Sequence, residues 1–517
     1  MNPSMFGVTQ ETLDMFKQMK PQDAAILEKV FNTALGLVWY DLEPTAKLLY
    51  PVITPLRNMI PRVAGAGGTA TNWKVITGIN VGGLSPGVSE GNRTARIVTN
   101  AANKSAPYKG LGLEDSVTFE ADYAALNFDD VKALAVLGLL RSLMIAEEKV
   151  ILYGCSDFQI NGGNACPTPS ATPTTGGALT ANSNYYGLCV PLTPEGYFNA
   201  GNNGVIQQVV RNNVDGTNDT YNGGCGKPSA QAGANTGAAN TAITFSVANN
   251  SVLGQLQGAA AYAWFCGNTA NNSNNTTLNL VAITTVPMYT FLGNETPYNQ
   301  TANNLTNAND CSNDTLLFDG LWGPICSNNY SSGSVTGAAS GSYFRDLGGN
   351  NLTVTTGTPA IVEIDTALKS FWDNYRLSPD IILLNSQEVM NITNKVMSGN
   401  GTPLIRFVFD ARDGVQSATA GAVIGTYLNK FSMDGGALVK LMLHPNMPPG
   451  SIMFYSTKIP YPLSNVTNVV QMKLRRDYYQ IEWPPVTRSY QYGIYMDGLL
   501  QNYFPPAFGL ITGIKNA

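Results

Sequence analysis

Apolar side chains recur at helical spacing over 127–153, and this pattern predicts the longest helix of the chain. Asn127 is a suitable N-cap residue, Asp129 and Asp130 stand in the first turn, and Gly154 is expected to end the helix. Charged residues interrupt the apolar run, so the stretch is too short to span a membrane. The positions that define its apolar face are Phe128, Val131, Leu134, Leu137, Leu140 and Met144.

Three further helical stretches are predicted. The apolar positions of 361–375 form a second helix that closes before Pro379, and Ser386 is expected to cap a third helix through Val396. Near the start of the chain, 11–37 has the pattern of one or two amphipathic helices.

Extended chain is predicted between these helices. Four prolines keep 41–62 out of a helix, since proline disfavours helix at its own position and at the one before. This arm has little of its own to pack on, so it is expected to lie along another subunit or domain. The stretch 65–126 predicts a long two-stranded ribbon with a glycine-rich, basic centre, and a lone ribbon needs a partner surface. Its β-type runs are 72–76, 96–99 and 116–123.

The last third of the chain adds strands to this helical framework. A short apolar run at 381–384 is typical of a buried strand, and several later runs alternate between apolar and polar residues. The predicted fold class is therefore α+β. The later runs are 452–455, 469–474, 478–483 and 490–496.

A stretch of different composition separates the two halves. Only ten charged residues occur in 155–344, which is instead rich in Asn, Thr, Ser and Gly and contains all seven cysteines. Such a change in mid-chain predicts an inserted domain, because insertions are tolerated at exposed loop tips. Short apolar runs between turn residues favour a β-sandwich or barrel over disorder. These runs are 241–247, 259–265, 278–285 and 288–292.

Bulk composition excludes some functions. The formal charge of −5 offers no strong attraction to nucleic-acid backbones, and no secretory signal precedes the first helices. Seven cysteines without a Cys-x-x-Cys pair leave at least one thiol unpaired, and reduced cysteines in a cytoplasmic protein are the simpler interpretation, although disulfides within the insert remain open.

No constellation for catalysis, cofactor binding or metal binding is found. The single histidine, His444, cannot form a histidine-based dyad or metal site and is interpreted as a surface or packing residue. The glycine-rich stretch 223–228 lacks the spacing of a phosphate loop, and Asp215-x-Thr217-x-Asp219 lacks the twelfth-position glutamate of a calcium loop. Both are interpreted as turns.

Two adjacent carboxylate pairs, Asp129–Asp130 and Glu147–Glu148, are explained by helix ends and solvent. The chain is therefore not expected to be an enzyme.

Three stretches together carry a family resemblance. They are 85–91 (Ser-Pro-Gly-Val-Ser-Glu-Gly), 116–154 with its acidic, Leu-x-Gly ending, and 366–396 with Leu384-Asn385. In this order and spacing they resemble the major capsid protein of tailed bacteriophages, the Hong Kong 97-type fold, over about 30–154 and 350–510.

The resemblance implies a domain plan. The expected parts are an N-terminal arm (1–64), an extended loop (65–126), a spine helix (127–154), an inserted β-rich domain on the outer surface (155–345), peripheral and axial helices (346–400), an axial domain (401–460) and returning peripheral strands with the C-terminus (461–517).

The resemblance also implies a function. Subunits would assemble in the host cytoplasm into hexamers and pentamers of an icosahedral virion shell, enclosing double-stranded DNA without sequence-specific binding. Scaffold, portal and decoration proteins are candidate partners, and no cofactor or membrane is implied. Lys104 or Lys109 could take part in a cross-link, but no glutamate base is assigned. The expected contacts between subunits are Glu90, Arg93, Arg96, Lys104 and Lys109.

Three other functions compete with this interpretation. A bacterial encapsulin would share the fold, but encapsulin chains are usually shorter and lack a long insert. A surface-layer or adhesin protein would fit the Asn- and Thr-rich middle, but no signal peptide or anchor is seen. Glycan binding by the insert would coexist with a shell role, using aromatic residues that core packing explains equally well. These are Tyr185, Tyr186, Tyr221 and Trp264.

Overall fold

A computed structural model of the chain describes residues 52–79, 87–93, 99–125, 130–201, 204–213, 215–247, 256, 258–268, 278–305, 310–329, 341–354, 360–398, 407–409, 416–418, 424–433, 436–462, 464–485 and 487–515. Contacts divide the chain into two compact units. One contains Met1–Tyr50 and Thr118–Leu134, and the other contains Pro51–Val117 and Ala135–Ala517. The helices expected in 11–37 lie outside the described residues.

The described part of the smaller unit contains α4 (Phe119–Ala124) and the start of α5 (Val131–Tyr153). The predicted strand 116–123 is wrong beyond Thr118, because the Thr118 hydroxyl accepts the Ala121 amide and caps α4. The Asp130 carboxylate accepts the amides of Lys132 and Ala133 at 3.1 Å each, so Asp130 caps α5. The expected cap, Asn127, lies outside the described residues.

Helix α5 ends where residues 318–321 of the inserted stretch contact its last turn. A Cβ at Gly154 would lie 2.5 Å from the Phe318 carbonyl oxygen, so only glycine fits there. The amide of Gly320 donates to the Gly154 carbonyl (2.8 Å) and that of Leu321 to the Ile151 carbonyl (2.9 Å). These bonds satisfy carbonyls that a helix C-terminus otherwise leaves unpaired. The predicted end at Gly154 is confirmed.

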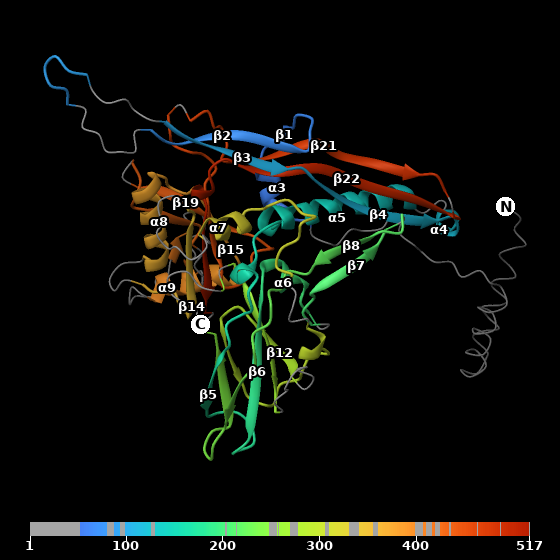
Figure 1. Cartoon of the computed structure of the whole chain (residues 1–517), viewed down its shortest axis with the longest axis vertical. Helices are drawn as coiled ribbons and strands as arrows, with labels where there is room; N and C mark the ends of the chain where they lie inside the picture. The colour runs from blue at the N-terminus through green and yellow to red at the C-terminus, as the bar shows by residue number, and fades with distance from the viewer. Residues whose placement is uncertain are drawn as a thin grey trace, which may run out of the picture. The chain divides into compact units, whose positions relative to one another are not determined.

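A four-stranded sheet of order β1-β21-β22-β4 lies beside α5 (Figure 1). The predicted strands 469–474 and 478–483 are one strand, interrupted by register shifts on either side of Arg476. It forms a long antiparallel hairpin with the next strand and a parallel pair with the short β1. The members are β1 (Arg62–Ala64), β4 (Lys109–Thr118), β21 (Val470–Trp483) and β22 (Ser489–Asn502).

A two-stranded ribbon is present within the predicted stretch 65–126, but it covers only 70–107, because β4 pairs with β22 and 119–124 are helical. Strands β2 (Ala70–Ile79) and β3 (Thr99–Pro107) pair antiparallel, with Trp73 opposite Lys104, and no third strand pairs with them among the described residues. The expected run 72–76 lies in β2, whereas most of 96–99 lies outside the described residues.

A six-stranded sheet forms the other layer of the host, and helices α8 (Val362–Tyr375) and α9 (Ser386–Ser398) lie beside it (Figure 1). Phe371 of α8 contacts Phe454 in the sheet, with ring centroids 5.7 Å apart. The α9 cap is Asn385 rather than Ser386, because the Asn385 side chain accepts the Gln387 amide. The strands, in sheet order, are β14 (Tyr343–Asn350), β23 (Gly509–Ile514), β20 (Ile452–Tyr455), β15 (Ile381–Leu384), β19 (Ala437–Leu443) and β18 (Thr426–Asn429).

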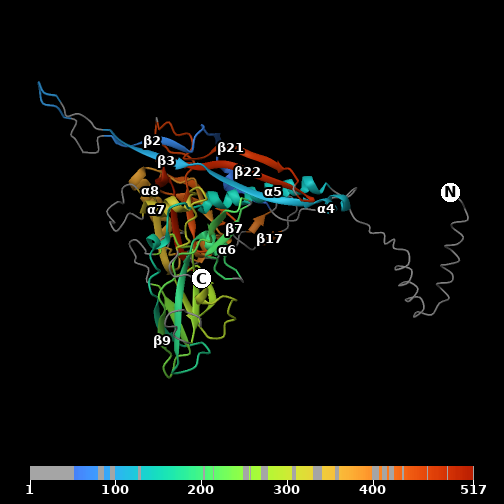
Figure 2. The same ribbon diagram turned by 45° about the vertical axis from the view of Figure 1, so that its right-hand side comes forward.

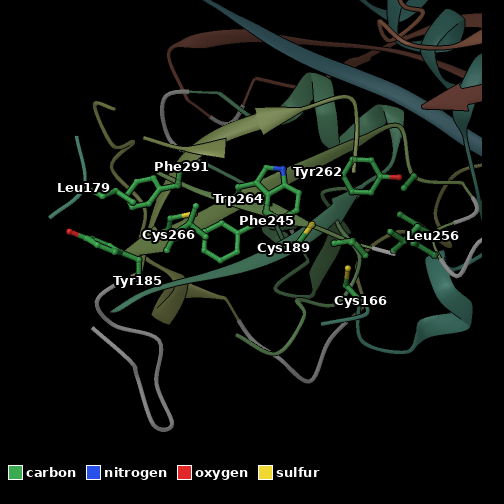
Figure 3. Packing of buried hydrophobic residues seen from close by; sticks show 14 residues of the cluster. Cys166, Leu179, Tyr185, Cys189, Phe245, Leu256, Tyr262, Trp264, Cys266 and Phe291 are labelled. Atoms are coloured by element: carbon green, nitrogen blue, oxygen red, sulfur yellow. The ribbon is translucent and has the colours of Figure 1, made fainter. Parts of the chain in front are cut away.

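Two sheets of the inserted stretch enclose one hydrophobic core, which contains the buried rings of Phe245, Tyr262 and Trp264 (Figure 3). Their order is β13-β10-β5 and β12-β11-β6-β9, and Figure 2 shows these strands together, away from β21 and β22. The four predicted β-type runs are all confirmed as strands. The strands are β5 (Ser170–Thr174), β6 (Asn184–Leu192), β9 (Ala232–Asn235), β10 (Ala242–Ser246), β11 (Ala261–Gly267), β12 (Asn279–Thr284) and β13 (Met288–Phe291).

The four-stranded sheet of the insert is buried on both faces. Its second face packs Leu188, Val190 and Phe265 against a second hydrophobic cluster that includes Cys225 and Cys311. This explains the continuous apolar run of β11, since both faces of that strand are covered. All seven cysteines are buried and free in the structure.

Smaller elements connect these layers. No helix in the described part of the chain is both long and apolar enough to cross a membrane. The remaining elements are α3 (Pro55–Met59), η1 (Ile160–Gly163), α6 (Pro194–Asn199), β7 (Gln208–Asn212), β8 (Asn218–Asn222), η2 (Ala302–Asn304), α7 (Trp322–Asn329), β16 (Phe407–Phe409), β17 (Gln416–Ala418) and η3 (Pro505–Ala507).

Candidate functional site

Two fully buried glutamates stand in the last turns of α5. Glu147 and Glu148 are both 0% exposed, so their interpretation as solvated helix-end residues is wrong. Carboxylates are almost never buried this deeply unless they are paired and hydrogen-bonded. The sequence contained a signal that Glu147 is buried. Glu147 follows Leu139 and Leu143 at intervals of four residues, so it lies with them on the buried face of α5.

Glu148 binds three donors from two distant segments. Its carboxylate accepts the amides of Leu56 (2.9 Å) and Arg57 (2.6 Å) at the start of α3, and it lies 2.7 Å from Nε2 of His444. The other ring nitrogen of His444 accepts the Asn446 amide at 3.2 Å. The ring therefore carries its proton on Nε2 and donates it to Glu148. His444 is thus a buried packing residue with a defined hydrogen-bonding role.

Glu147 binds two arginines and a tyrosine. Its carboxylate accepts Nε of Arg57 (3.0 Å), a guanidinium nitrogen of Arg62 (2.6 Å) and the hydroxyl of Tyr478. Both guanidinium groups lie over the Tyr478 ring, at 5.2 and 5.0 Å from its centroid. Burial, together with the Glu147 charge, raises the pKa of Tyr478 to about 12.

Asp477 completes the cluster at its exposed edge. Arg62 donates to its carboxylate at 2.8 Å. Burial opposes ionisation of Asp477, but the bonds from Arg62 and from the Tyr478 amide outweigh it and lower its pKa. The cluster therefore pairs Glu147 and Asp477 with two arginines, whereas Glu148 is satisfied by two backbone amides and His444.

This cluster fixes the segment that enters the fold before the ribbon. We name 54–64 the strap: it contains α3 and β1, and its Leu56 and Ile60 are buried. The expectation that 41–62 is extended is wrong for 55–59, which form α3. The reason is tertiary, since α5 and β21 supply the surface. The expectation that the arm, with little of its own to pack on, lies along another subunit or domain fits the strap, which packs on α5 and β21 of the same chain. Residues 41–51 lie outside the described residues.

Contacts with the body hold the ribbon near its root. Thr71 donates its hydroxyl proton to the Tyr108 hydroxyl (2.8 Å), Arg475 lies over the Tyr108 ring, and Trp73 packs edge-on against Tyr503 at 6.2 Å. Towards the far end, Ile76 is 63% exposed. A cavity of about 240 Å³ at the root is lined by residues from β2, β3, β22 and 317–320. The Trp73 indole N–H has no hydrogen-bond partner in the described part of the chain.

The five predicted contact residues are distributed along this region. Glu90 and Arg93 are exposed in the described stretch 87–93, Lys104 is exposed on β3, and Arg96 lies outside the described residues. Lys109, at the start of β4, donates to the Thr315 carbonyl at 2.5 Å and so joins the ribbon root to the inserted stretch of the same chain.

The other motifs serve as turns. The amides of Gly223, Gly224 and Gly226 all donate to backbone carbonyls within the fold, so they do not point at a phosphate. Asp215 accepts the amide and hydroxyl of Thr217, which is the geometry of an Asx-type turn.

One group of potential metal ligands lies close together in the described part of the chain: Cys155, Asp157 and Asp319. The Cys155 thiol donates to the Phe158 carbonyl, and burial together with the Asp319 charge raises its pKa to about 12. Asp319 accepts the Ser156 amide at 2.7 Å. These groups already fix the loop after α5, and we assign no metal to them.

Known proteins with a similar structure are found among solved capsids. No family model matches the chain, and no curated protein matches it significantly. Among solved structures, the capsid of Myoviridae phage XM1 matches with a TM-score of 0.39 and 10% identity, covering 93% of this chain and 98% of that one. The capsid of the native GTA particle matches with a TM-score of 0.37 and 9% identity, covering 92% and 95%.

An encapsulin from Synechococcus elongatus matches over a smaller region, with a TM-score of 0.20 and 14% identity, covering 33% of this chain and 55% of that one. The matches that span nearly the whole chain are thus phage capsids, the class of protein that the sequence resembles. At these TM-scores the likeness decides neither fold nor function, and the functional conclusion depends on the geometry of the chain itself.

Proposed function

We propose that this chain is a subunit of a phage capsid with the Hong Kong 97-type plan. In this proposal α5 is the spine helix, the strap is the inner end of the N-terminal arm, and β2 and β3 form the extended loop that lies across a neighbouring subunit. The domain boundaries expected from the sequence are retained in the proposal, with the inserted β-rich domain on the outer surface.

The ribbon is the observation that carries the proposal. In the part of the chain that the structure describes, no third strand pairs with β2 and β3, and most of their described side chains are exposed. A two-stranded ribbon with exposed Ile76 is marginal in water by itself, so a stable protein needs a surface to cover it. A neighbouring copy of the same chain supplies such a surface in a closed shell.

The rigid root makes the ribbon suitable for this role. Glu147 and Glu148 bind the strap to α5, and the Gly65 amide, directly after β1, donates to the Leu474 carbonyl at 2.6 Å. The direction in which the ribbon leaves the body is therefore fixed by buried contacts. A fixed direction lowers the conformational entropy lost when the ribbon docks.

A second exposed apolar surface lies at the edge of the six-stranded sheet. Strand β18 is the edge strand, and Leu428 and Leu438 on β18 and β19 are 55% and 69% exposed. Met433, between these strands, is 90% exposed. In the proposed plan this region belongs to the axial domain, where subunits meet around the centre of hexamers and pentamers. Two apolar contact surfaces per copy, each modest, are sufficient for a stable assembly.

Charged contacts would add specificity to these surfaces. We include Glu90, Arg93, Arg96 and Lys104 as contacts to acidic and basic groups of the next subunit. Lys109 already donates a hydrogen bond to the Thr315 carbonyl of the same chain, so its role in the proposal is to stabilise the root of the ribbon. The net charge of −5 suits a shell that encloses double-stranded DNA without binding it tightly.

Assembly of the purified full-length chain tests the proposal. We expect closed shells in negative-stain electron micrographs and a fast-sedimenting species in ultracentrifugation. Ile76→Asp should abolish shells while leaving a folded subunit, because its side chain is exposed. Val210→Asp is a matched control, since Val210 is 58% exposed on another two-stranded ribbon, β7–β8.

Flat lattices would instead indicate a surface-layer protein. A compact monomer, or shells that form equally well from the Ile76 variant, would contradict the proposed role of the ribbon. Shells that carry a protein cargo and no DNA after purification from infected or lysogenic cells would favour an encapsulin.

A further inference from the structure

Two cysteines of the inserted stretch lie directly opposite each other. Cys225 and Cys311 form an antiparallel bridge, and the Cys311 amide donates to the Cys225 carbonyl at 2.9 Å. Residues paired in this way have Cα atoms about 4.5–5.5 Å apart, within the range that disulfides span. Their thiols are hydrogen-bonded to each other. The two sulfur atoms are therefore close enough to bond without a change of fold.

The two thiols differ in their surroundings. Cys311 lines a cavity of about 420 Å³, together with Val205, Gln208 and Gln300. Cys225 lies behind it in a second bridge, to Leu192. The hydrogen bond from Cys225 lowers the pKa of Cys311, whereas the same bond and burial raise the pKa of Cys225. A peroxide in the cavity therefore meets Cys311 before Cys225, and the thiolate is the reactive form of a thiol.

We propose that Cys225 and Cys311 are an oxidation site, at which a small peroxide that enters the cavity converts the two thiols into a disulfide. This inference does not depend on the capsid proposal. If both hold, the reaction would occur when a particle leaves a reducing cytoplasm.

The reaction balances in two steps. The Cys311 thiolate attacks one oxygen of hydrogen peroxide, the O–O bond breaks, and the leaving hydroxide takes up a proton to give water and a sulfenic acid on Cys311. The Cys225 sulfur then attacks the Cys311 sulfur. The S–O bond breaks, and the second hydroxide leaves as water with the Cys225 thiol proton. Two thiols are oxidised, and one peroxide is reduced to two waters.

A second thiol pair provides an internal comparison. The Cys166 and Cys189 thiols are also hydrogen-bonded, but both belong to the closed core between the two sheets of the insert (Figure 3). Cys266 lies in the same core. These three cysteines and Cys311 are all buried, and Cys311 is 0% exposed, so the difference is the cavity that Cys311 lines. Because a peroxide in that cavity lies beside Cys311, we expect Cys311 to oxidise faster than these three thiols.

A disulfide between positions 225 and 311 would constrain the insert. The segment between them contains β9, β10, β11, β12 and β13, which are strands of both sheets. A cross-link that closes so long a loop restricts the unfolded chain more than a short one does. We expect the oxidised protein to resist proteolysis of the insert about tenfold longer than the reduced protein.

Peptide mapping of the full-length chain tests the inference. The reduced protein is treated with hydrogen peroxide, quenched, and cleaved on the N-terminal side of aspartate without reductant. This cleavage isolates Cys311 in the short peptide 310–313 and leaves Cys225 in the peptide 219–309, which also contains Cys266. A second cleavage, after the aromatic residues Tyr262, Trp264 and Phe265, separates Cys225 from Cys266. We expect the peptides that contain Cys225 and Cys311 to be linked, with two of the seven thiols lost and both recovered after reduction.

Single variants separate the roles of the two thiols. With dimedone added at the quench, Cys225→Ala should accumulate a dimedone adduct on Cys311, since the resolving thiol is missing. Cys311→Ala should show no adduct on Cys225. Cys266→Ala, a buried cysteine outside the pair, should form the linked peptides at the wild-type rate.

Wild-type protein alone is sufficient to overturn the inference if a variant does not fold. The inference fails if peroxide leaves peptide 310–313 unlinked, if it links 310–313 to Cys266 rather than Cys225, or if Cys189 is oxidised as fast as Cys311. It also fails if Cys225 is the residue that captures dimedone.

Discussion

Replacing Glu148 by glutamine tests whether the buried cluster holds the strap to α5. All three partners of Glu148 donate hydrogen bonds: the Leu56 amide, the Arg57 amide and Nε2 of His444. Glutamine has one acceptor oxygen, so its amide nitrogen must face a donor. Moving the His444 proton to the other ring nitrogen, Nδ1, does not help, because Nδ1 would then be a donor facing the Asn446 amide, which is also a donor.

The magnitude follows from the bonds that are lost. A hydrogen bond to a buried charge contributes about 1.5–3 kcal/mol, and a buried donor without an acceptor costs about 1–3 kcal/mol. These terms overlap, so we expect Glu148→Gln to lower the free energy of unfolding by about 3 kcal/mol. Glu482→Gln is the matched control, since Glu482 is exposed on β21, and should change it by less than about 0.5 kcal/mol.

Urea denaturation of both variants at one low protein concentration measures the difference, because assembly would otherwise add to the apparent stability. Hydrogen exchange of the strap amides provides a local measurement, and exchange at Leu56 and Arg57 should accelerate most. Equal denaturation midpoints for the two variants, or unchanged exchange in the strap, would refute the proposed role of Glu148.

Two further predictions concern α5 and α9. Gly154→Ala places a Cβ 2.5 Å from the Phe318 carbonyl and should destabilise the subunit by about 2 kcal/mol in thermal denaturation, whereas Gly138→Ala, with open space around its Cβ, should stabilise it by about 0.5–1 kcal/mol. Burial raises the pKa of Glu388 from 4.5 to about 7, so the folded state retains a proton that the unfolded state releases. Its contribution is present below pH 4.5 and is lost as pH rises to 7, by about 3 kcal/mol. In pH-dependent urea denaturation Glu388→Gln should flatten this fall and Glu482→Gln should not, and equal slopes for both variants would contradict the assignment to Glu388.

The buried cluster and the ribbon are connected through the strap. The cluster has no role that would require contact with solvent, because arginines, backbone amides and His444 already bind its carboxylates. Its effect is to fix where the strap ends and the ribbon begins. An exposed ribbon whose root is held by such contacts is suited to binding a neighbour.

Local patterns in the sequence were sufficient for most helices and strands. The end of α5 at Gly154, the helix α8 and the four apolar runs of the insert are confirmed, because periodicity and turn residues act over a few neighbouring positions. Predictions failed where two local signals competed. At Thr118 the β-type run continued in sequence, but the threonine hydroxyl capped α4 and ended the strand.

The pairing of distant residues was decided only by the tertiary structure. The residues that bind Glu147 and Glu148 lie 85 to 331 positions away in the chain, and no local pattern connects them. The same holds for Cys225 and Cys311, which a bridge brings together although they lie far apart in the sequence of the insert. Sequence therefore determined which segments are helix, strand and inserted domain, since those depend on short-range periodicity. Which carboxylates are buried, which thiols are neighbours and which ribbon is left uncovered depend on long-range packing.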